Sequence, residues 1–246
     1  MKKLGIIILI VIVLIVGIKL LLPKTVVVLG YHDFTNSNSN DEFIMNSKDF
    51  ERQIKYLSDH HYKSLTLKDV ECFLNKTCKL PRKSVLITMD DGWKNELNIA
   101  IPILNKYKMN AVIFYIGYNY DKDYDNYLNK KDIEYIKNNY SNIEIASHTY
   151  NMHYEDAYLK DKSDIIGDIK KQKEIINSEA FAYPYGLYNE TYIEALKEEG
   201  YKLAFTFGPG KKHRKVKQGD SIYEIPRLNM QADYPFWKFK LRLLLP

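Results

Sequence analysis

Short runs rich in β-branched and aromatic residues alternate with helical patterns along most of this 246-residue chain. Seven runs have the length and composition of strands, at residues 25–32, 84–90, 110–117, 143–150, 180–186, 202–208 and 223–228. Helical patterns occupy residues 47–62, 66–77, 94–108, 130–140, 162–177 and 190–199. Strands alternating with helices of this length are typical of parallel sheets built from βα units. We therefore predict one α/β domain over residues 24–246, a distorted or incomplete (β/α) barrel of about seven parallel strands.

The first residues differ from the rest of the chain, because residues 4–22 form an apolar run whose only charged residue is Lys19. About 20 such residues cross the hydrocarbon core as a helix, and a lysine near the end can extend to the interface. Lys2 and Lys3 precede the run and are expected to stay in the cytoplasm. We predict a transmembrane signal-anchor at residues 1–23, with the catalytic domain outside the cell membrane. The alternative is secretion after signal cleavage, although no small-residue cleavage site follows the run.

Charge and cysteine content narrow the classes of partner and site. The formal net charge is +5, and Lys2, Lys3 and Lys19 of the predicted anchor contribute three of these charges. The remaining domain carries only about +2, too little for the concentrated basic face that nucleic acids require, so we expect no nucleic-acid partner. Cys72 and Cys78 are too few for a sulfur-based structural zinc site. In an oxidising compartment they can pair, and two free thiols are an equal alternative.

Polar and charged residues gather where the predicted strands end. Five strand ends carry them: His32, Asp90 with Asp91, His148 with His153 in the loop beyond, residues 183–186, and Arg227. In a parallel βα barrel the carboxyl ends of the strands form one rim, where catalytic groups collect. The predicted fold therefore brings residues from distant parts of the chain to one candidate active site.

The acid pair and the two histidines at this rim suit hydrolytic metal chemistry. Neighbouring strand residues point to opposite sides, so Asp90 and Asp91 are suited to different tasks, one binding a metal ion and one accepting a proton. Two imidazoles and one carboxylate leave coordination positions open for water and substrate, as in hydrolytic zinc sites. Alone, the acid pair followed by Gly92 is more often a turn than a functional site, and a single histidine is more often packed or solvated. Their convergence on one rim favours a metal site.

The segments that carry these residues resemble motifs of the polysaccharide deacetylases, the NodB-homology domain of carbohydrate esterase family 4. LITMDDGW resembles the TFDDG motif of that family. SHTYNMH resembles its histidine motif, in the longer-spaced form of the poly-β-1,6-N-acetylglucosamine deacetylases of biofilm exopolysaccharide systems. VVLGYHDF, FAYPYG and IPRL are similar to further segments of that branch, which includes the intercellular adhesin deacetylase. The resemblance spans about residues 25–230.

The resemblance implies a role for each matched residue. Asp90 is expected to be the general base and His32 the general acid, while the backbone N–H of Tyr185 helps to bind the oxyanion. The implied metal ligands are Asp91, His148 and His153, with zinc as the expected ion and cobalt or nickel as alternatives. The candidate substrate-binding residues are Trp93, Tyr150, Pro184 and Gly186.

Ala182 departs from the family pattern. Many relatives carry an arginine four residues before the glycine of the YG motif, where this chain has Ala182. We hypothesise that Arg227 supplies the missing positive charge and orients or tunes Asp90.

The resemblance implies metal-dependent hydrolysis of N-acetyl groups from an extracellular polysaccharide, with release of acetate. Poly-β-1,6-N-acetylglucosamine is the first candidate substrate and peptidoglycan the second. A non-catalytic glycan-binding domain on the same fold is the alternative from another class. Expected partners are the polysaccharide, the membrane through the N-terminal helix, and a machinery for exopolysaccharide synthesis. The C-terminal residues 237–246 alternate apolar and basic side chains, which fits a membrane-surface segment, an edge strand or a packing tail.

Overall fold

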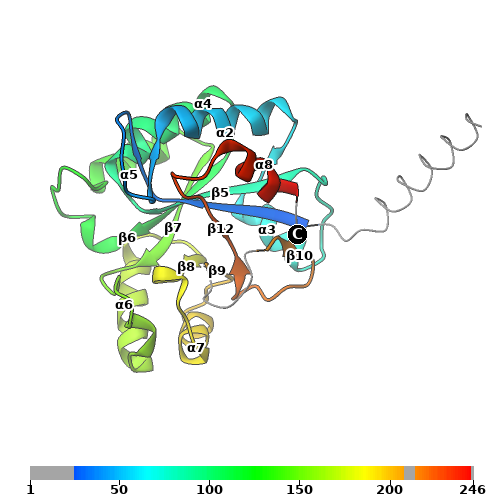
Figure 1. The fold of residues 1–246 in the computed structure, drawn as a ribbon. Coiled ribbons are helices and arrows are strands. Elements are labelled where there is room, and N and C mark those ends of the chain that lie inside the picture. The colour runs from blue at the N-terminus through cyan, green and yellow to red at the C-terminus, as the bar shows by residue number, and fades with distance from the viewer. Residues whose placement is uncertain (1–24, 208–213, 245–246) are drawn as a thin grey trace, which may run out of the picture.

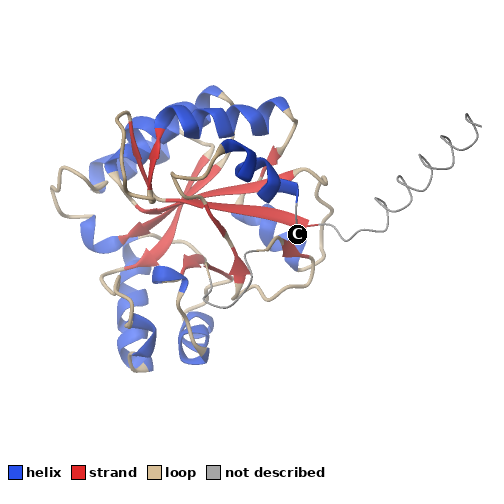
Figure 2. Cartoon of the chain, in the orientation of Figure 1, coloured by secondary structure: helices blue, strands red, loops and turns tan. Residues whose placement is uncertain are grey.

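The computed structural model describes residues 25–207 and 214–244, so the predicted anchor at residues 1–23 lies outside the described range. In the part of the chain that is described, no helix has the length and apolar character needed to span a membrane. The strands lie at the centre of the molecule and helices surround them (Figure 2).

A sheet of ten strands, counted over the described residues, curves into a nearly closed barrel. Its main path runs β10-β1-β5-β6-β7-β8-β9-β11, with β4 added to β5 and β12 added to β1. The strand bounds are β1 (Thr25–Tyr31), β4 (Lys63–Ser64), β5 (Ser84–Asp91), β6 (Ala111–Ile116), β7 (Ile143–Thr149), β8 (Ala180–Ala182), β9 (Leu203–Thr206), β10 (Val216–Lys217), β11 (Ile225–Pro226) and β12 (Leu228–Asn229). All pairs in this sheet are parallel except β1 with β10, which agrees with the predicted α/β class.

The barrel is closed by a segment predicted as a single strand over residues 223–228. The structure corrects this, because the segment is divided between the two edges of the sheet. Ile225 pairs with Phe205 of β9, whereas Leu228 pairs with Leu29 of β1. Arg227 lies between the two short strands, and its backbone N–H donates to the carbonyl of Thr206 at 2.9 Å. The last strands therefore connect the two edges of the sheet and leave Arg227 at the junction.

Helices occur at every predicted position and surround the barrel (Figure 1). Their bounds are α2 (Ser47–Asp59), α3 (Leu67–Leu74), the π-helical turn η1 (Glu96–Ala100) continuing into α4 (Ile101–Lys106), α5 (Lys130–Asn139), α6 (Lys162–Ile175) and α7 (Glu190–Glu198). A further helix, α8 (Phe236–Leu244), forms from the C-terminal segment, so of the alternatives for that segment an edge strand is wrong. Three 3₁₀ turns complete the helical elements: η2 (Gly117–Asn119), η3 (Ala157–Leu159) and η4 (Pro184–Gly186).

The residues of β1 show why these strands are apolar along their whole length. Val27 and Leu29 pack in the core cluster that contains residues of α2, α4 and α5. Val26 and Val28 pack in a second cluster, with the buried side chains of α3 and of the barrel strands. Successive side chains of a strand point to opposite faces, and here both faces are covered. The same reason explains why every residue of β5 and β6 is buried.

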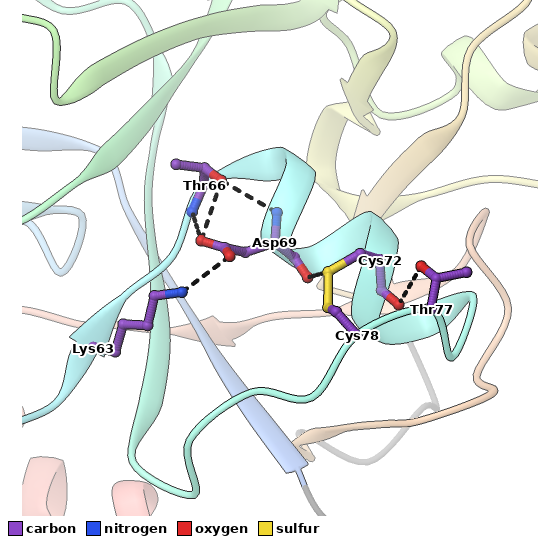
Figure 3. The surroundings of a disulfide bond; sticks show 6 residues. All are labelled: Lys63, Thr66, Asp69, Cys72, Thr77 and Cys78. Carbon is purple, nitrogen blue, oxygen red and sulfur yellow. Dashed lines mark hydrogen bonds and ion pairs between the residues drawn. A yellow bond between two sulfur atoms is a disulfide. The ribbon is translucent and has the colours of Figure 1, made fainter.

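Two local features fix elements at the edge of the barrel. A disulfide joins Cys72 in α3 to Cys78, with Cα atoms 5.4 Å apart, so the paired form is the one observed (Figure 3). Thr66 and Asp69 form a capping box that satisfies backbone donors at the start of the same helix. A small separate sheet pairs β2 (Asp33–Thr35) with β3 (Ile44–Asn46), on either side of residues 36–43.

Candidate metal centre and catalytic cleft

A cleft with a volume of about 460 Å³ opens where the barrel strands end. It combines histidines, carboxylates and aromatic rings that come from segments far apart in the chain. Its lining residues are His32, Asp33, Asp41, Phe43, Ile44, Asp90, Asp91, Trp93, His148, His153, Tyr185, Phe207 and Asn229. The structure therefore brings Asp90, Asp91, His32 and both motif histidines together, as the strand-end pattern predicts.

The turn after β5 directs both neighbouring carboxylates into this cleft. Asp91 has a φ of 80°, in the left-handed region that few residues other than glycine adopt. Gly92 follows with a φ of 79°, and a Cβ atom there would lie 2.4 Å from the ring of Tyr115. Only glycine fits at that position. The backbone strain at Asp91 is of the kind that concentrates at functional sites, since surrounding contacts must hold it in place.

Asp91 forms a compact cluster with the two motif histidines. Its Oδ1 lies 3.4 Å from Nε2 of His148 and 3.2 Å from Nε2 of His153. One donor atom from each residue lies within 4.8 Å of the others. Four ligands at about 2.0–2.1 Å in a tetrahedral arrangement are separated by about 3.3 Å, so the observed spacing matches a small divalent ion.

The hydrogen bonds around this cluster also favour a cation. Nδ1 of His148 lies 2.7 Å from the carbonyl oxygen of Ala182 and donates to it, so Nε2 of the neutral ring presents a lone pair to Asp91. Oδ1 of Asp91 is buried and receives no hydrogen bond that meets ordinary geometry among the described residues. Lone pairs that converge in a buried site require a positive charge between them. The three residues therefore fit a divalent metal.

Without a metal, protons on the imidazoles would balance the charge of Asp91. Burial opposes ionisation of this carboxyl, yet the adjacent imidazoles of His148 and His153 hold its pKa well below the ordinary value. Burial also opposes the charging of His148, but the adjacent carboxylate of Asp91 and the nearby charge of Asp90 hold its pKa above the ordinary value. A metal ion and these protons thus compete for the same site.

Asp90 has a different and more closed environment. Its two carboxylate oxygens accept hydrogen bonds from Nη1 and Nη2 of Arg227 at 2.6 and 2.8 Å. Both side chains are almost fully buried, and Nη1 also contacts the hydroxyl of Thr88 at 3.2 Å. Burial opposes the charge of Asp90, but the Arg227 guanidinium holds its pKa below the ordinary value. Arg227 thus lies where a positive charge was hypothesised.

His32 directly follows β1 and lies between two aromatic rings. Its ring centroid lies 4.9 Å from that of Phe43 and 5.8 Å from that of Phe207. Burial lowers the pKa of His32, and the charges of Asp90 and Asp91 only partly oppose this shift. Its Nδ1 is buried without a hydrogen-bond partner among the described residues. In the unliganded cleft the neutral imidazole is therefore the favoured form at neutral pH.

Tyr185 covers the outer side of the metal cluster. It adopts a left-handed φ of 56° within η4, and its ring stacks on His153 with centroids 5.0 Å apart. Gly186 follows with a φ of 70°, and a Cβ atom there would lie 2.5 Å from the backbone nitrogen of Phe207. Pro184 and Gly186 are buried and are not among the residues that line the cleft. Their placement supports a role in shaping η4, and not the predicted contact with substrate.

The other two candidate substrate-binding residues are placed differently from each other. Trp93 lines the cleft, its indole Nε1 donates to Oδ2 of Asp91 at 3.1 Å, and its ring stacks on Tyr127 at 4.4 Å between centroids. Tyr150 does not line the cleft. Its ring meets Tyr118 edge-on and lies under the Lys171 ammonium, so a direct substrate contact by Tyr150 has no support from this geometry.

Asp168, which the sequence pattern did not single out, holds the loop between the two metal-site histidines. Its carboxylate accepts hydrogen bonds from the backbone N–H groups of Tyr150 and Asn151, both at 2.8 Å, and from the hydroxyl of Thr149. It comes from the buried face of α6, next to Ile165 and Ile169. A carboxylate on the buried stripe of a helix needs hydrogen-bond donors nearby. This position of Asp168 in the helical pattern is the signal by which the sequence could have identified it.

The walls of the cleft also contain residues that no motif predicted. Asp41 and Phe43 come from the segment between β2 and β3, while Phe207 and Asn229 follow β9 and end β12. Each belongs to a loop or a very short strand whose path depends on tertiary pairing. Sequence periodicity carries little information on such segments.

Comparison with known proteins agrees with this geometry. A family model described as polysaccharide deacetylase matches residues 78–204. The poly-β-1,6-N-acetyl-D-glucosamine N-deacetylase of Staphylococcus aureus (strain MRSA252) is 31% identical over 217 residues, which cover 81% of this chain and 72% of that protein. The YxkH protein of Bacillus subtilis (strain 168), which carries the polysaccharide deacetylase name, is 31% identical over 76% of this chain. The match spans 66% of YxkH, just under two thirds of its length.

Solved structures show the same fold. The deacetylase PplD of Streptococcus pyogenes, determined in complex with acetate, matches with a TM-score of 0.79 at 22% identity, over 90% of this chain and 99% of that chain. IcaB from Ammonifex degensii matches with a TM-score of 0.75 at 24% identity, over 90% of this chain and 96% of that chain. At these identities the likeness establishes the architecture, and the chemistry depends on the residues of the cleft.

Proposed function

Because this chain belongs to the polysaccharide deacetylase family, we propose that it hydrolyses N-acetyl groups from N-acetylglucosamine units of an extracellular polysaccharide and releases acetate. One observation carries this function. The Asp91–His148–His153 cluster and the Arg227-bound Asp90 lie in a single cleft. A cation site beside an ionised carboxylate is the pair of groups that amide hydrolysis by water requires.

The proposed substrate is poly-β-1,6-N-acetylglucosamine. Support comes from the Staphylococcus aureus relative, whose name specifies this polymer and which matches over 81% of this chain. The cleft has a volume of about 460 Å³, and Trp93, which lines it and is supported by the stacked ring of Tyr127, provides an aromatic face next to Asp91. Aromatic faces of this kind pack against the apolar C–H surfaces of sugar rings.

A divalent ion held by Asp91, His148 and His153 would polarise the acetyl carbonyl and lower the pKa of a water molecule from ~15.7 toward ~7. Zinc is the ion that we propose, because two imidazoles, one carboxylate and an open position are a common hydrolytic zinc set, with cobalt and nickel as alternatives. Asp168 would keep the His153 loop in the conformation that presents this ligand.

The remaining steps belong to the side chains of this protein. Asp90 is ionised and would accept the proton of the attacking water as general base, oriented by the two N–H groups of Arg227. The backbone N–H of Tyr185 would donate to the oxygen of the former carbonyl as negative charge develops there. His32, which also lines the cleft, would pass a proton to the nitrogen of the leaving amine as general acid.

We also propose that the catalytic domain lies on the outer side of the cell membrane, held there by the apolar segment at residues 4–22. The Cys72–Cys78 disulfide supports this location, because disulfides persist mainly in oxidising compartments. A deacetylase in that position would meet the polysaccharide as it leaves a synthesis machinery in the same membrane. Each acetyl group removed would give the polymer a positive charge and increase its attraction to an anionic cell surface.

The test is acetate release by the full-length protein in detergent, from β-1,6-linked N-acetylglucosamine oligomers and from peptidoglycan. We expect acetate from the β-1,6-linked oligomers, loss of release with a chelator, and recovery when zinc is returned. If acetate is released only from peptidoglycan, then peptidoglycan is the substrate and poly-β-1,6-N-acetylglucosamine is not. Binding of oligomers with no acetate from either polymer, at full metal occupancy, would identify a glycan-binding domain without catalysis.

A further inference from the structure

Helix α8 presents large apolar side chains on its outer face. Trp237, Leu241 and Leu244 are 62%, 41% and 69% exposed. Their spacing of four and three residues places them on one narrow stripe, since an α-helix advances about 100° per residue. Trp237 and Leu244 are among the most exposed large apolar residues in the described part of the chain.

The inner face of the same helix is fixed firmly to the domain. Phe239 and Leu243 are buried, and Phe236 and Phe239 both meet the ring of Tyr56 in α2 edge-on. The guanidinium of Arg52 lies 4.4 Å from the centre of the Phe236 ring. The helix therefore has two apolar faces, one packed on the barrel helices and one facing outward.

Charges on α8 are of one sign and border the outer stripe. Lys238 and Lys240 lie on either side of the stripe by the same helical geometry. No acidic residue occurs from residue 235 to residue 246. An apolar stripe with tryptophan, bordered by lysines, is the pattern of helices that lie in the interface of a membrane containing anionic lipids.

The position of α8 brings this stripe next to the predicted anchor. The ammonium of Lys215 donates to the carbonyl of Leu244 at 2.9 Å, and the neighbouring β10 pairs Lys217 with Thr25 at the start of β1. Figure 1 shows the end of α8 beside the beginning of β1. The predicted anchor ends at residue 23, two residues before β1. A bilayer reached by the anchor is therefore within reach of α8.

From these observations we propose that α8 docks on the outer surface of the anchoring membrane. Trp237, Leu241 and Leu244 insert at the level of the lipid headgroups, while Lys238 and Lys240 bind anionic lipids. Lipid is favoured over a second copy of the chain, because a second α8 would bring lysines against lysines. The anchor and α8 then form two contacts that fix how the domain stands on the membrane.

The experiment uses the full-length chain reconstituted in vesicles and the emission of its two tryptophans, Trp93 and Trp237. Subtracting the emission of a Trp237→Phe variant isolates Trp237. We expect lipids brominated near the headgroup to quench Trp237, and to quench it more strongly when the vesicles contain phosphatidylglycerol than when they contain phosphatidylcholine alone.

Two matched pairs of variants test the proposed contacts. Lys238→Glu/Lys240→Glu should reduce partitioning of the helix about fivefold or more per reversed lysine, whereas Lys131→Glu/Lys137→Glu on α5 should leave quenching unchanged. Leu244→Ser should weaken quenching, whereas Leu159→Ser, at a residue that is 64% exposed on η3, should not. Circular dichroism will show whether the charge reversals disturb folding. If they do, the Leu244→Ser and Leu159→Ser variants still test the proposal.

Three results would overturn the proposal. The first is the absence of Trp237 quenching in any vesicle, whether or not the chain floats with the lipid. The second is quenching that the α8 variants and their matched controls reduce equally. The third is that, without lipid, Trp237 becomes shielded from solvent as the protein concentration rises. This result would show that the apolar stripe of α8 contacts another copy of the chain.

Discussion

Asp90 and Asp91 are neighbours in the sequence and both line the cleft, but their surroundings differ. Asp90 is closed, since both of its oxygens accept hydrogen bonds from Arg227, which is supplied 137 residues later in the chain. Asp91 is open, since it faces two imidazoles across gaps of 3.2 and 3.4 Å. Two identical side chains in one turn thus differ in their electrostatic surroundings, because their partners come from different and distant parts of the sequence. Asp90 keeps its charge by pairing with the fixed guanidinium of Arg227. Asp91 is placed to share its charge with a divalent metal ion or, without one, with protons on the two imidazoles.

Replacing the open carboxylate should have the largest effect. Asp91→Asn removes the anionic ligand, so we expect metal content after dialysis to fall to the level of the buffer and acetate release to fall to background. Elemental analysis and an acetate assay measure the two quantities. A variant that keeps both its zinc and its activity would show that Asp91 is not a ligand.

Replacing the closed carboxylate should separate proton transfer from metal binding. Asp90→Asn keeps the size and shape of the side chain, so we expect full metal occupancy with activity lowered by about 10²–10⁴, the usual contribution of a general base. Undiminished turnover at equal metal content would refute the assignment of Asp90 as the base.

The ion pair between Asp90 and Arg227 can also be broken by replacing the arginine. Arg227→Met leaves the Asp90 charge buried and unpaired, and we expect unfolding to become easier by about 3–5 kcal/mol in denaturant titration. The double variant Arg227→Met/Asp90→Asn should recover most of this stability without recovering activity. If the double variant is as unstable as the single one, Arg227 stabilises the barrel by packing and not by its charge.

A smaller effect is expected at Asp168, which acts on the Asp91 side by holding the His153 loop. Asp168→Asn loses acceptor capacity toward Tyr150 and Asn151, so we expect metal affinity to weaken by about 10–100-fold, as for residues that orient metal ligands. Excess zinc should restore kcat, which a general loss of folding would not allow. Zinc titration against a competing chelator gives the affinity directly.

The smallest effect is a change in the shape of the pH profile. A general acid must be protonated, and burial lowers the pKa of His32 from its ordinary value of 6.5. The contribution of protonated His32 is present below the lowered pKa and is lost as pH rises through it. With metal saturating, kcat/KM should therefore decline with rising pH in a range below 6.5, and His32→Asn should lack this decline. An increase over the same range would show that neutral His32 accepts a proton.

The sequence predicted the parts of this molecule that repeat a simple pattern. Apolar runs such as those of β5 and β6 are buried on both faces, which a run of β-branched and aromatic residues already indicates. The residues His32, Asp90, Asp91, His148 and His153 were identified because parallel strands carry their ends to one rim. A periodic pattern fixes where such residues lie, and the motif then suggests their chemistry.

The sequence did not predict contacts that depend on tertiary geometry. The opposite-side rule for strand neighbours suggested separate faces for Asp90 and Asp91, but the left-handed backbone at Asp91 turns both into the cleft. The division of residues 223–228 into β11 and β12 depends on the two edges of the sheet being close enough to share one segment. Tyr150 lies inside a motif yet does not line the cleft, because a motif contains residues that shape the loop as well as residues that act.

The placement of Arg227 between β11 and β12 also affects when the enzyme becomes competent. The guanidinium that holds Asp90 follows it by 137 residues, and it reaches the carboxylate only when β11 and β12 have paired with the two edges of the sheet. A chain in which these short strands have not yet paired would therefore have its cleft residues without the contact that orients Asp90. Closure of the barrel and assembly of the cleft are thus one event.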